Sequence, residues 1–235
     1  MNKSIFIAGT DTGAGKTVIT GLLAGYLAGR GLNVITQKWV QTGNRGLSED
    51  ILAHMEFLDN GKDLLERYHS LMAPYVFGYP ASPHLAAGLE QAEISIPRII
   101  KSHETLKEHF DIVIVEASGG VLVPLNRERT MIDLVRDLGL EVIMVAANKL
   151  GAINHTLLSI EALVKRDITI AGVIFNRVSE HGDDTILADN VKIIEKFSGV
   201  KVLGEIGFGQ DKAALRAMFR PIGARFVASA RRGRS

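Results

Sequence analysis

The sequence contains no cysteine, which excludes disulfide bonds, thiolate metal sites and a cysteine nucleophile. No apolar run approaches the roughly 18 residues of a membrane-spanning helix, and no secretory pattern precedes the first apolar segment. Charge of one sign is not in excess either. Lys and Arg number 27 against 26 for Asp and Glu, so the balance indicates neither nucleic acid nor a membrane as partner. We therefore expect a soluble, cytoplasmic protein.

Apolar residues make up 46% of the 235 residues, which is enough to bury one large core. We expect a single domain over residues 1–235, with a basic tail from about residue 225 that includes Arg231-Arg232-Gly233-Arg234. Apolar segments typical of strands cover residues 4–8, 33–38, 111–116, 141–146, 169–176 and 201–206. Amphipathic helical patterns separate them. This alternation predicts an α/β fold with a mostly parallel β-sheet and helices on both faces.

A glycine-rich segment, GTDTGAGKT at residues 9–17, connects the first strand pattern to a helical pattern. It ends like a phosphate-binding loop, although standard spacing would place the first glycine at Thr10 and the chain has it at Gly9. Such a loop directs backbone N–H groups and the positive end of a helix at one point, where Lys16 would reach phosphates and Thr17 would bind Mg²⁺. The alternative is a glycine-rich turn with a surface lysine. We favour nucleotide binding and a P-loop NTPase-like fold.

Other polar residues follow the carboxyl ends of predicted strands, where ligands bind in sheets of this kind. Glu116 ends one strand and could hold Mg²⁺ opposite the loop, or could merely cap the next turn. Lys38 ends another and could neutralise a transferring phosphoryl group, or could be an ordinary surface lysine. The residues alone leave both alternatives open.

In their order along the chain, these motifs resemble the dethiobiotin synthetase family, ATP-dependent enzymes of biotin synthesis. The resemblance runs from Gly9 to about Gly207 through GTDTGAGKT, KWVQTG, PYVFGYPASPH, VEASGG, KLGAINH, FNRV and LGEIG. It implies that 7,8-diaminopelargonic acid, CO₂ and ATP are the substrates, that Mg²⁺ is the cofactor, and that a carbamate is phosphorylated before the ring closes. It also implies a homodimer in which the segment 151–154 of one subunit binds the substrate carboxylate in the site of the other.

The resemblance further implies roles for individual residues. Catalysis is expected of Thr12, Lys16, Lys38 and Thr42, and Mg²⁺ binding of Thr17, Asp50 and Glu116. ATP is expected to contact Gly13, Ala14, Gly15, Lys16, Thr17, Val18, Glu116, Gly119, Asn176 and Gly207. The substrate is expected to contact Thr12, Lys38, Thr42, Gly119, Gly151, Ala152, Ile153 and Asn154, of which Asn154 is also expected to be a helix N-cap.

The chain departs from the family pattern in several places. Gly13 replaces glutamate, Trp39 proline, Thr42 serine, Ala117 glycine, Ser118 alanine and Gly207 proline. Loss of the loop glutamate keeps open a degenerate paralogue that only binds nucleotide. A P-loop ATPase switch of the partition or septum-site type is a second rival, but it would have a signature lysine where this chain has Asp11. An amidotransferase of cobyrinic acid synthesis would need a cysteine-dependent glutaminase domain.

Overall fold

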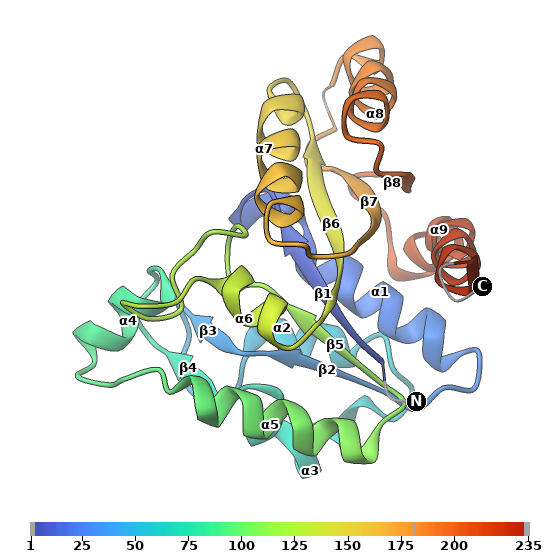
Figure 1. The fold of residues 1–235 in the computed structure, drawn as a ribbon. Helices are drawn as coiled ribbons and strands as arrows, with labels where there is room; N and C mark the ends of the chain where they lie inside the picture. Colours follow the sequence, from blue (N-terminus) through green and yellow to red (C-terminus); the bar gives the residue numbers. More distant parts are fainter. Residues whose placement is uncertain (1–2, 181, 233–235) are drawn as a thin grey trace.

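Six parallel strands form the central sheet in the part of the chain that the computed structural model describes, residues 3–180 and 182–232 (Figure 1). They are β1 (Lys3–Gly9), β2 (Val34–Lys38), β5 (Ile112–Glu116), β6 (Glu141–Asn148), β7 (Ile170–Arg177) and β8 (Val202–Ile206). Their order across the sheet is β2-β5-β1-β6-β7-β8. Each strand coincides with a predicted apolar segment, and the predicted α/β fold class is confirmed.

The strand β1 lies inside the sheet, between two strands that come much later in the chain. Ile5 aligns with Ile114 of β5 and with Glu141 of β6. On the other side of β5, Lys38 of β2 stands in register with Glu116. The parallel order therefore brings the carboxyl ends of β1, β2 and β5 to one edge of the sheet.

Helices cover both faces of this sheet (Figure 1). The helices α1 and α9 pack against each other on one face, and α7 and α8 pack together on the other. The bounds are Lys16–Ala28 for α1, Glu49–Met55 for α2, Gly61–Met72 for α3, Pro83–Leu89 for α4, Ile96–His109 for α5, Met131–Asp137 for α6, Ala152–Val164 for α7, Asp184–Ser198 for α8 and Lys212–Arg232 for α9. Within the described part of the chain, every helix is too short or too polar to span a bilayer.

A second, small sheet escaped the sequence prediction. The strands β3 (Val40–Thr42) and β4 (Tyr75–Phe77) pair in parallel beside the main sheet. Three residues are too few to give a periodic signal. Between β2 and β3 lies Trp39, which is fully buried. The centroid of its ring is 5.3 Å from the ring centroid of Phe6. Its indole N–H donates to Gln37 Oε1 at 3.1 Å, so this aromatic residue is both packed and hydrogen-bonded.

One local prediction is wrong, and another lies partly outside the described residues. The helix α7 has Gly151 as its N-cap, with a φ of 87°, so the expected N-cap role of Asn154 is wrong and that residue lies in the first turn. The helix α9 continues to Arg232, so the expected basic tail is helical from residue 225 to that point. Gly233 and Arg234 of the expected tail lie outside the described residues.

Candidate active site

Two glycines of the loop between β1 and α1 lie where a Cβ would be crowded. At Gly15 the backbone φ is 91°, and a Cβ would lie 2.0 Å from Nδ2 of Asn176, which also donates to the carbonyl oxygen of Ala14 at 3.1 Å. At Gly9 a Cβ would lie 2.8 Å from Cδ of Lys16. The lysine side chain therefore passes directly over Gly9, and a side chain at position 9 would displace it.

The Lys16 side chain is buried within the loop. Its ammonium donates to the carbonyl oxygens of Asp11 at 2.8 Å and of Thr12 at 3.4 Å. Burial, together with the nearby charge of Lys38, lowers the pKa of Lys16 to about 8, although the carboxylates of Glu116 and Asp50 oppose both effects.

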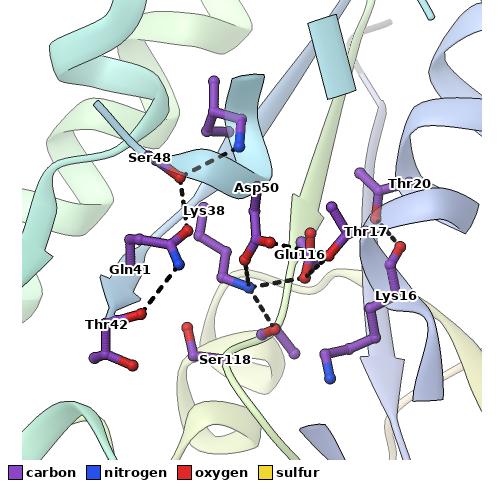
Figure 2. Close-up of polar contacts among 12 residues, drawn as sticks. Lys16, Thr17, Thr20, Lys38, Gln41, Thr42, Ser48, Asp50, Glu116 and Ser118 are labelled. Carbon is purple, nitrogen blue, oxygen red and sulfur yellow. Dashed lines mark hydrogen bonds and ion pairs between the residues drawn. The ribbon is translucent and has the colours of Figure 1, made fainter. Parts of the chain in front are cut away.

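Opposite the loop, two carboxylates, a hydroxyl and an ammonium meet (Figure 2). Lys38 Nζ lies 2.7 Å from Glu116 Oε1 and 2.7 Å from Asp50 Oδ2, and it donates to the carbonyl oxygen of Ala117 at 3.1 Å. Thr17 Oγ1 lies 3.1 Å from Asp50 Oδ1 and 3.2 Å from Glu116 Oε1. Lys38 is only 4% exposed, so it is not the surface lysine of the alternative interpretation. Glu116 likewise points into this cluster.

The charges of this cluster stabilise one another. Burial alone would raise the pKa of Glu116, but the charge of Lys38 and the hydrogen bonds from His54 and Lys38 outweigh it and hold the pKa at about 2. Burial alone would lower the pKa of Lys38, but Glu116 and Asp50 outweigh it and raise the pKa above its ordinary value. The buried pair is therefore ionised at neutral pH.

The oxygen atoms of Thr17, Asp50 and Glu116 form a donor set that suits Mg²⁺. This ion prefers hard oxygen ligands and is usually bound by one or two carboxylates together with waters and substrate phosphates. Among the described residues, no group of three or more His, Cys, Asp or Glu side chains is placed to hold a metal ion. Mg²⁺ bound here would need further ligands from waters or phosphates, and its binding by these three residues stays a prediction.

The other residues predicted for the site lie on several elements around the cluster of Lys38 and Glu116. A Cβ on Gly119 would lie 3.8 Å from Thr12 Oγ1, so these two residues face each other. Thr42 ends β3 and is half-buried, and Val18 lies in the first turn of α1 with a partly exposed side chain. Gly207 follows β8 and is separated from the loop by β6 and β7. Their contacts with ligands stay predictions.

The position of the missing loop glutamate is open. Nothing lies within 4 Å of a Cβ built on Gly13, and its φ of −82° suits any residue. Gly13 and Ala152 line the same small cavity of about 60 Å³, together with His155 at the start of α7. Ile153 and Asn154 instead line the groove between α7 and α8.

One residue of the cluster was missed by sequence reasoning. His54 is completely buried, and its Nε2 lies 2.7 Å from Glu116 Oε2. The only signal in the sequence was its position four residues after Asp50 in a helical pattern, which places both side chains on one face of α2.

Comparison with known proteins identifies relatives of similar length. A family model described as an AAA domain matches residues 3–212. The ATP-dependent dethiobiotin synthetase of Chlorobaculum tepidum is 44% identical over 205 residues, which cover 87% of this chain and 82% of the relative. The dethiobiotin synthetase of Haemophilus influenzae is 43% identical, over 77% of this chain and 94% of the relative. The one of Methanocaldococcus jannaschii is 37% identical, over 88% of this chain and 95% of the relative.

Solved structures with the same fold are more distant in sequence. The structure of pNOB8 ParA bound to nonspecific DNA has a TM-score of 0.64 at 15% identity, covering 99% of both chains. A ParA family ATPase from Chlorobium tepidum has a TM-score of 0.56 at 17% identity, covering 98% of this chain and 99% of that one. At such identities the likeness concerns the fold alone.

Proposed function

Because the chain belongs to the family of ATP-dependent dethiobiotin synthetases, ligases of biotin synthesis, we propose that it converts 7,8-diaminopelargonic acid, CO₂ and ATP into dethiobiotin, ADP and phosphate. One amine attacks CO₂ and loses a proton to form a carbamate. A carbamate oxygen attacks the γ-phosphorus of ATP, and ADP leaves. The second amine then attacks the carbonyl carbon of this carbamic-phosphoric anhydride, and phosphate leaves as the cyclic urea forms.

The observation that carries this proposal is the position of Lys38. Its buried ammonium lies 2.7 Å from both Asp50 and Glu116, in the cluster that includes Thr17 of the phosphate-binding loop. The reaction joins two anions, a carbamate and a triphosphate, so positive charge placed between them lowers the barrier. Lys16 supplies a second ammonium, which would exchange the carbonyl oxygens of the loop for phosphate oxygens.

The other residues bind and orient the substrates. Thr17, Asp50 and Glu116 would hold Mg²⁺, which supplies further charge neutralisation at the phosphates. The hydroxyls of Thr12 and Thr42 orient the carbamate by hydrogen bonds.

The remaining nucleotide contacts follow from the loop and the strand ends. The backbone of residues 13–18 surrounds the phosphates, and Gly119 lies beside them. Asn176, which is anchored to the loop through Ala14, and Gly207 face the nucleoside end. Gly207 stands where the family has proline, so the contact with the base differs from the family pattern at that position.

We also propose a homodimer formed through α7 and α8. A groove of about 740 Å³ runs between these helices, and Leu150 and Leu158 on it are 80% and 56% exposed. A second copy of the chain would cover these apolar side chains and place its segment 151–154 near the substrate carboxylate.

The dimer is tested by Leu158→Glu, because this side chain is exposed and the change leaves the core intact. We expect light scattering to show a monomer, the KM for the diamine to rise by about tenfold or more, and ATP binding to persist. A fully active wild-type monomer would contradict the arrangement.

The reaction is tested by incubating purified protein with the diamine, bicarbonate and MgATP and measuring dethiobiotin and phosphate together. We expect equal amounts of the two products from the wild type and neither from Lys16→Ala. Phosphate release that does not need the diamine would instead indicate a P-loop ATPase switch. Nucleotide binding without either product would indicate a degenerate paralogue.

A further inference from the structure

His54 occupies a position in the cluster that the proposed chemistry leaves unexplained. It is fully buried on α2, one turn after Asp50. Its Nε2 lies 2.7 Å from Glu116 Oε2, and its Nδ1 lies 3.1 Å from the hydroxyl oxygen of Thr36 on β2. A buried imidazole with both nitrogens engaged is held in a single orientation.

The hydrogen bond between His54 and Glu116 runs in one direction. A carboxylate only accepts hydrogen bonds, so Nε2 of His54 must carry a proton and donate to Glu116. Nδ1 faces the Thr36 hydroxyl, which can donate or accept and therefore serves as its partner in either case.

The two oxygens of Glu116 consequently face different partners. Oε1 lies 2.7 Å from Lys38 Nζ and 3.2 Å from Thr17 Oγ1, on the side of the phosphate-binding loop. Oε2 is held by His54 on the inner side. Because a donor fixes each oxygen, the carboxylate plane cannot rotate without breaking a buried hydrogen bond.

The helix that presents His54 is itself anchored at its start. Ser48 caps α2 by accepting from the N–H of Ile51 at 3.2 Å, and its hydroxyl donates to Gln41 Oε1 of β3 at 2.7 Å (Figure 2). The same short helix therefore supplies Asp50 directly to the cluster and supports Glu116 through His54.

We propose that His54 is a positioning residue that orients Glu116 for Mg²⁺ and thereby sets the Mg²⁺ dependence of nucleotide binding. Ligand carboxylates are commonly held by outer hydrogen bonds of this kind, and their loss typically costs 10-fold to 100-fold in metal affinity. The inference rests on the proposed function for the identity of the metal and the nucleotide. It concerns binding, however, and can be measured without the diamine.

The test compares three variants by calorimetric titration of ATP at a series of Mg²⁺ concentrations. His54→Leu keeps the volume and removes the donor, so we expect the Mg²⁺ needed for half-maximal ATP affinity to rise by about 10-fold to 100-fold. His54→Gln places an amide N–H near the position of Nε2 and should restore the midpoint to within about threefold. Thr36→Val removes only the hydrogen bond between Thr36 and Nδ1 of His54. We expect it to shift the Mg²⁺ midpoint by an amount between those of the two His54 variants.

Two results would overturn the inference. One is a folded His54→Leu with the wild-type Mg²⁺ midpoint, and the other is a His54→Gln as impaired as His54→Leu. If His54→Leu does not fold, an unchanged midpoint in Thr36→Val together with an impaired His54→Gln overturns it as well. A wild type that binds MgATP but makes no dethiobiotin would refute the proposed reaction and leave this inference standing.

Discussion

Replacement of Lys38 by glutamine removes the ammonium that lies between two carboxylates. Breaking a buried ion pair by removing one partner costs about 3–5 kcal/mol, and we expect the lower value because the Asp50 side chain is 25% exposed. The free energy of unfolding should therefore fall by about 3 kcal/mol at pH 7. Lys165→Gln is the matched control, since Lys165 lies 2.6 Å from Glu161 but is 70% exposed, and its loss should have little effect on stability.

The loss should depend on pH through Glu116. Burial opposes ionisation of this carboxyl, and Lys38 with His54 nevertheless lowers its pKa from 4.5 to about 2. A depressed carboxyl pKa contributes stability that is complete above the unfolded value and lost as pH falls through the folded value. Without Lys38 this contribution shrinks, so the difference between wild type and variant should be largest above pH 4.5 and diminish below it.

Urea unfolding at pH 7 and pH 4 measures both effects, and initial rates measure the consequence for the reaction. We expect the kcat of Lys38→Gln to fall by about 100-fold while the Kd for ATP changes little, because the charge acts mainly on the transition state. A variant as stable as Lys165→Gln, or one with near wild-type turnover, would refute the reasoning about this buried ammonium.

Three further predictions follow from the loop and the core. Lys16→Ala should abolish turnover and weaken ATP binding by roughly 10-fold to 100-fold in calorimetry, and normal affinity would contradict the loop assignment. Gly13→Ala should raise the free energy of unfolding by about 0.5 kcal/mol, because the φ of Gly13 is −82° and an added Cβ would meet nothing within 4 Å. Gly15→Ala should lower it by about 2 kcal/mol, because the φ of Gly15 is 91° and an added Cβ would lie 2.0 Å from Asn176. Equal urea midpoints for the two variants would contradict this prediction. Burial lowers the pKa of His103 to about 4, so between pH 6.5 and pH 4 only the unfolded chain takes up the proton. The free energy of unfolding should therefore fall as the pH drops through this range, by up to about 1.4 kcal/mol per pH unit. His103→Gln should flatten this slope in urea unfolding at several pH values, and parallel profiles of wild type and variant would contradict the prediction.

The central sheet was predictable because its strands are buried on both faces and therefore read as continuous apolar runs. The small sheet of β3 and β4 was not, since three residues carry no period. The roles of individual side chains were likewise predictable only in part. Lys16 and Thr17 stand in a motif with a fixed geometry, whereas Lys38 needed the register of β2 with β5 before its burial could be known.

His54 shows why part of the cluster escaped prediction. Its spacing from Asp50 was visible, but no local pattern distinguishes a histidine that supports a carboxylate from one that fills a core. Only the tertiary contact between α2 and the carboxyl end of β5 gives Nε2 its partner, Glu116. The N-cap of α7 was misplaced for a local reason, because Gly151 can adopt the left-handed conformation that ends the preceding turn.

The position of β1 between β5 and β6 has a consequence for how the chain folds during synthesis. In the described sheet, β1 pairs with strands that are synthesised much later and that end at residues 116 and 148. At about 5–20 residues per second, β1 waits roughly 7–28 s for both neighbours. During this interval its apolar side chains, together with the nascent phosphate-binding loop, have no sheet to join. We expect chaperones that shield apolar segments to act during this interval. Given the role proposed for Glu116, we expect nucleotide to assist folding only after this residue has emerged.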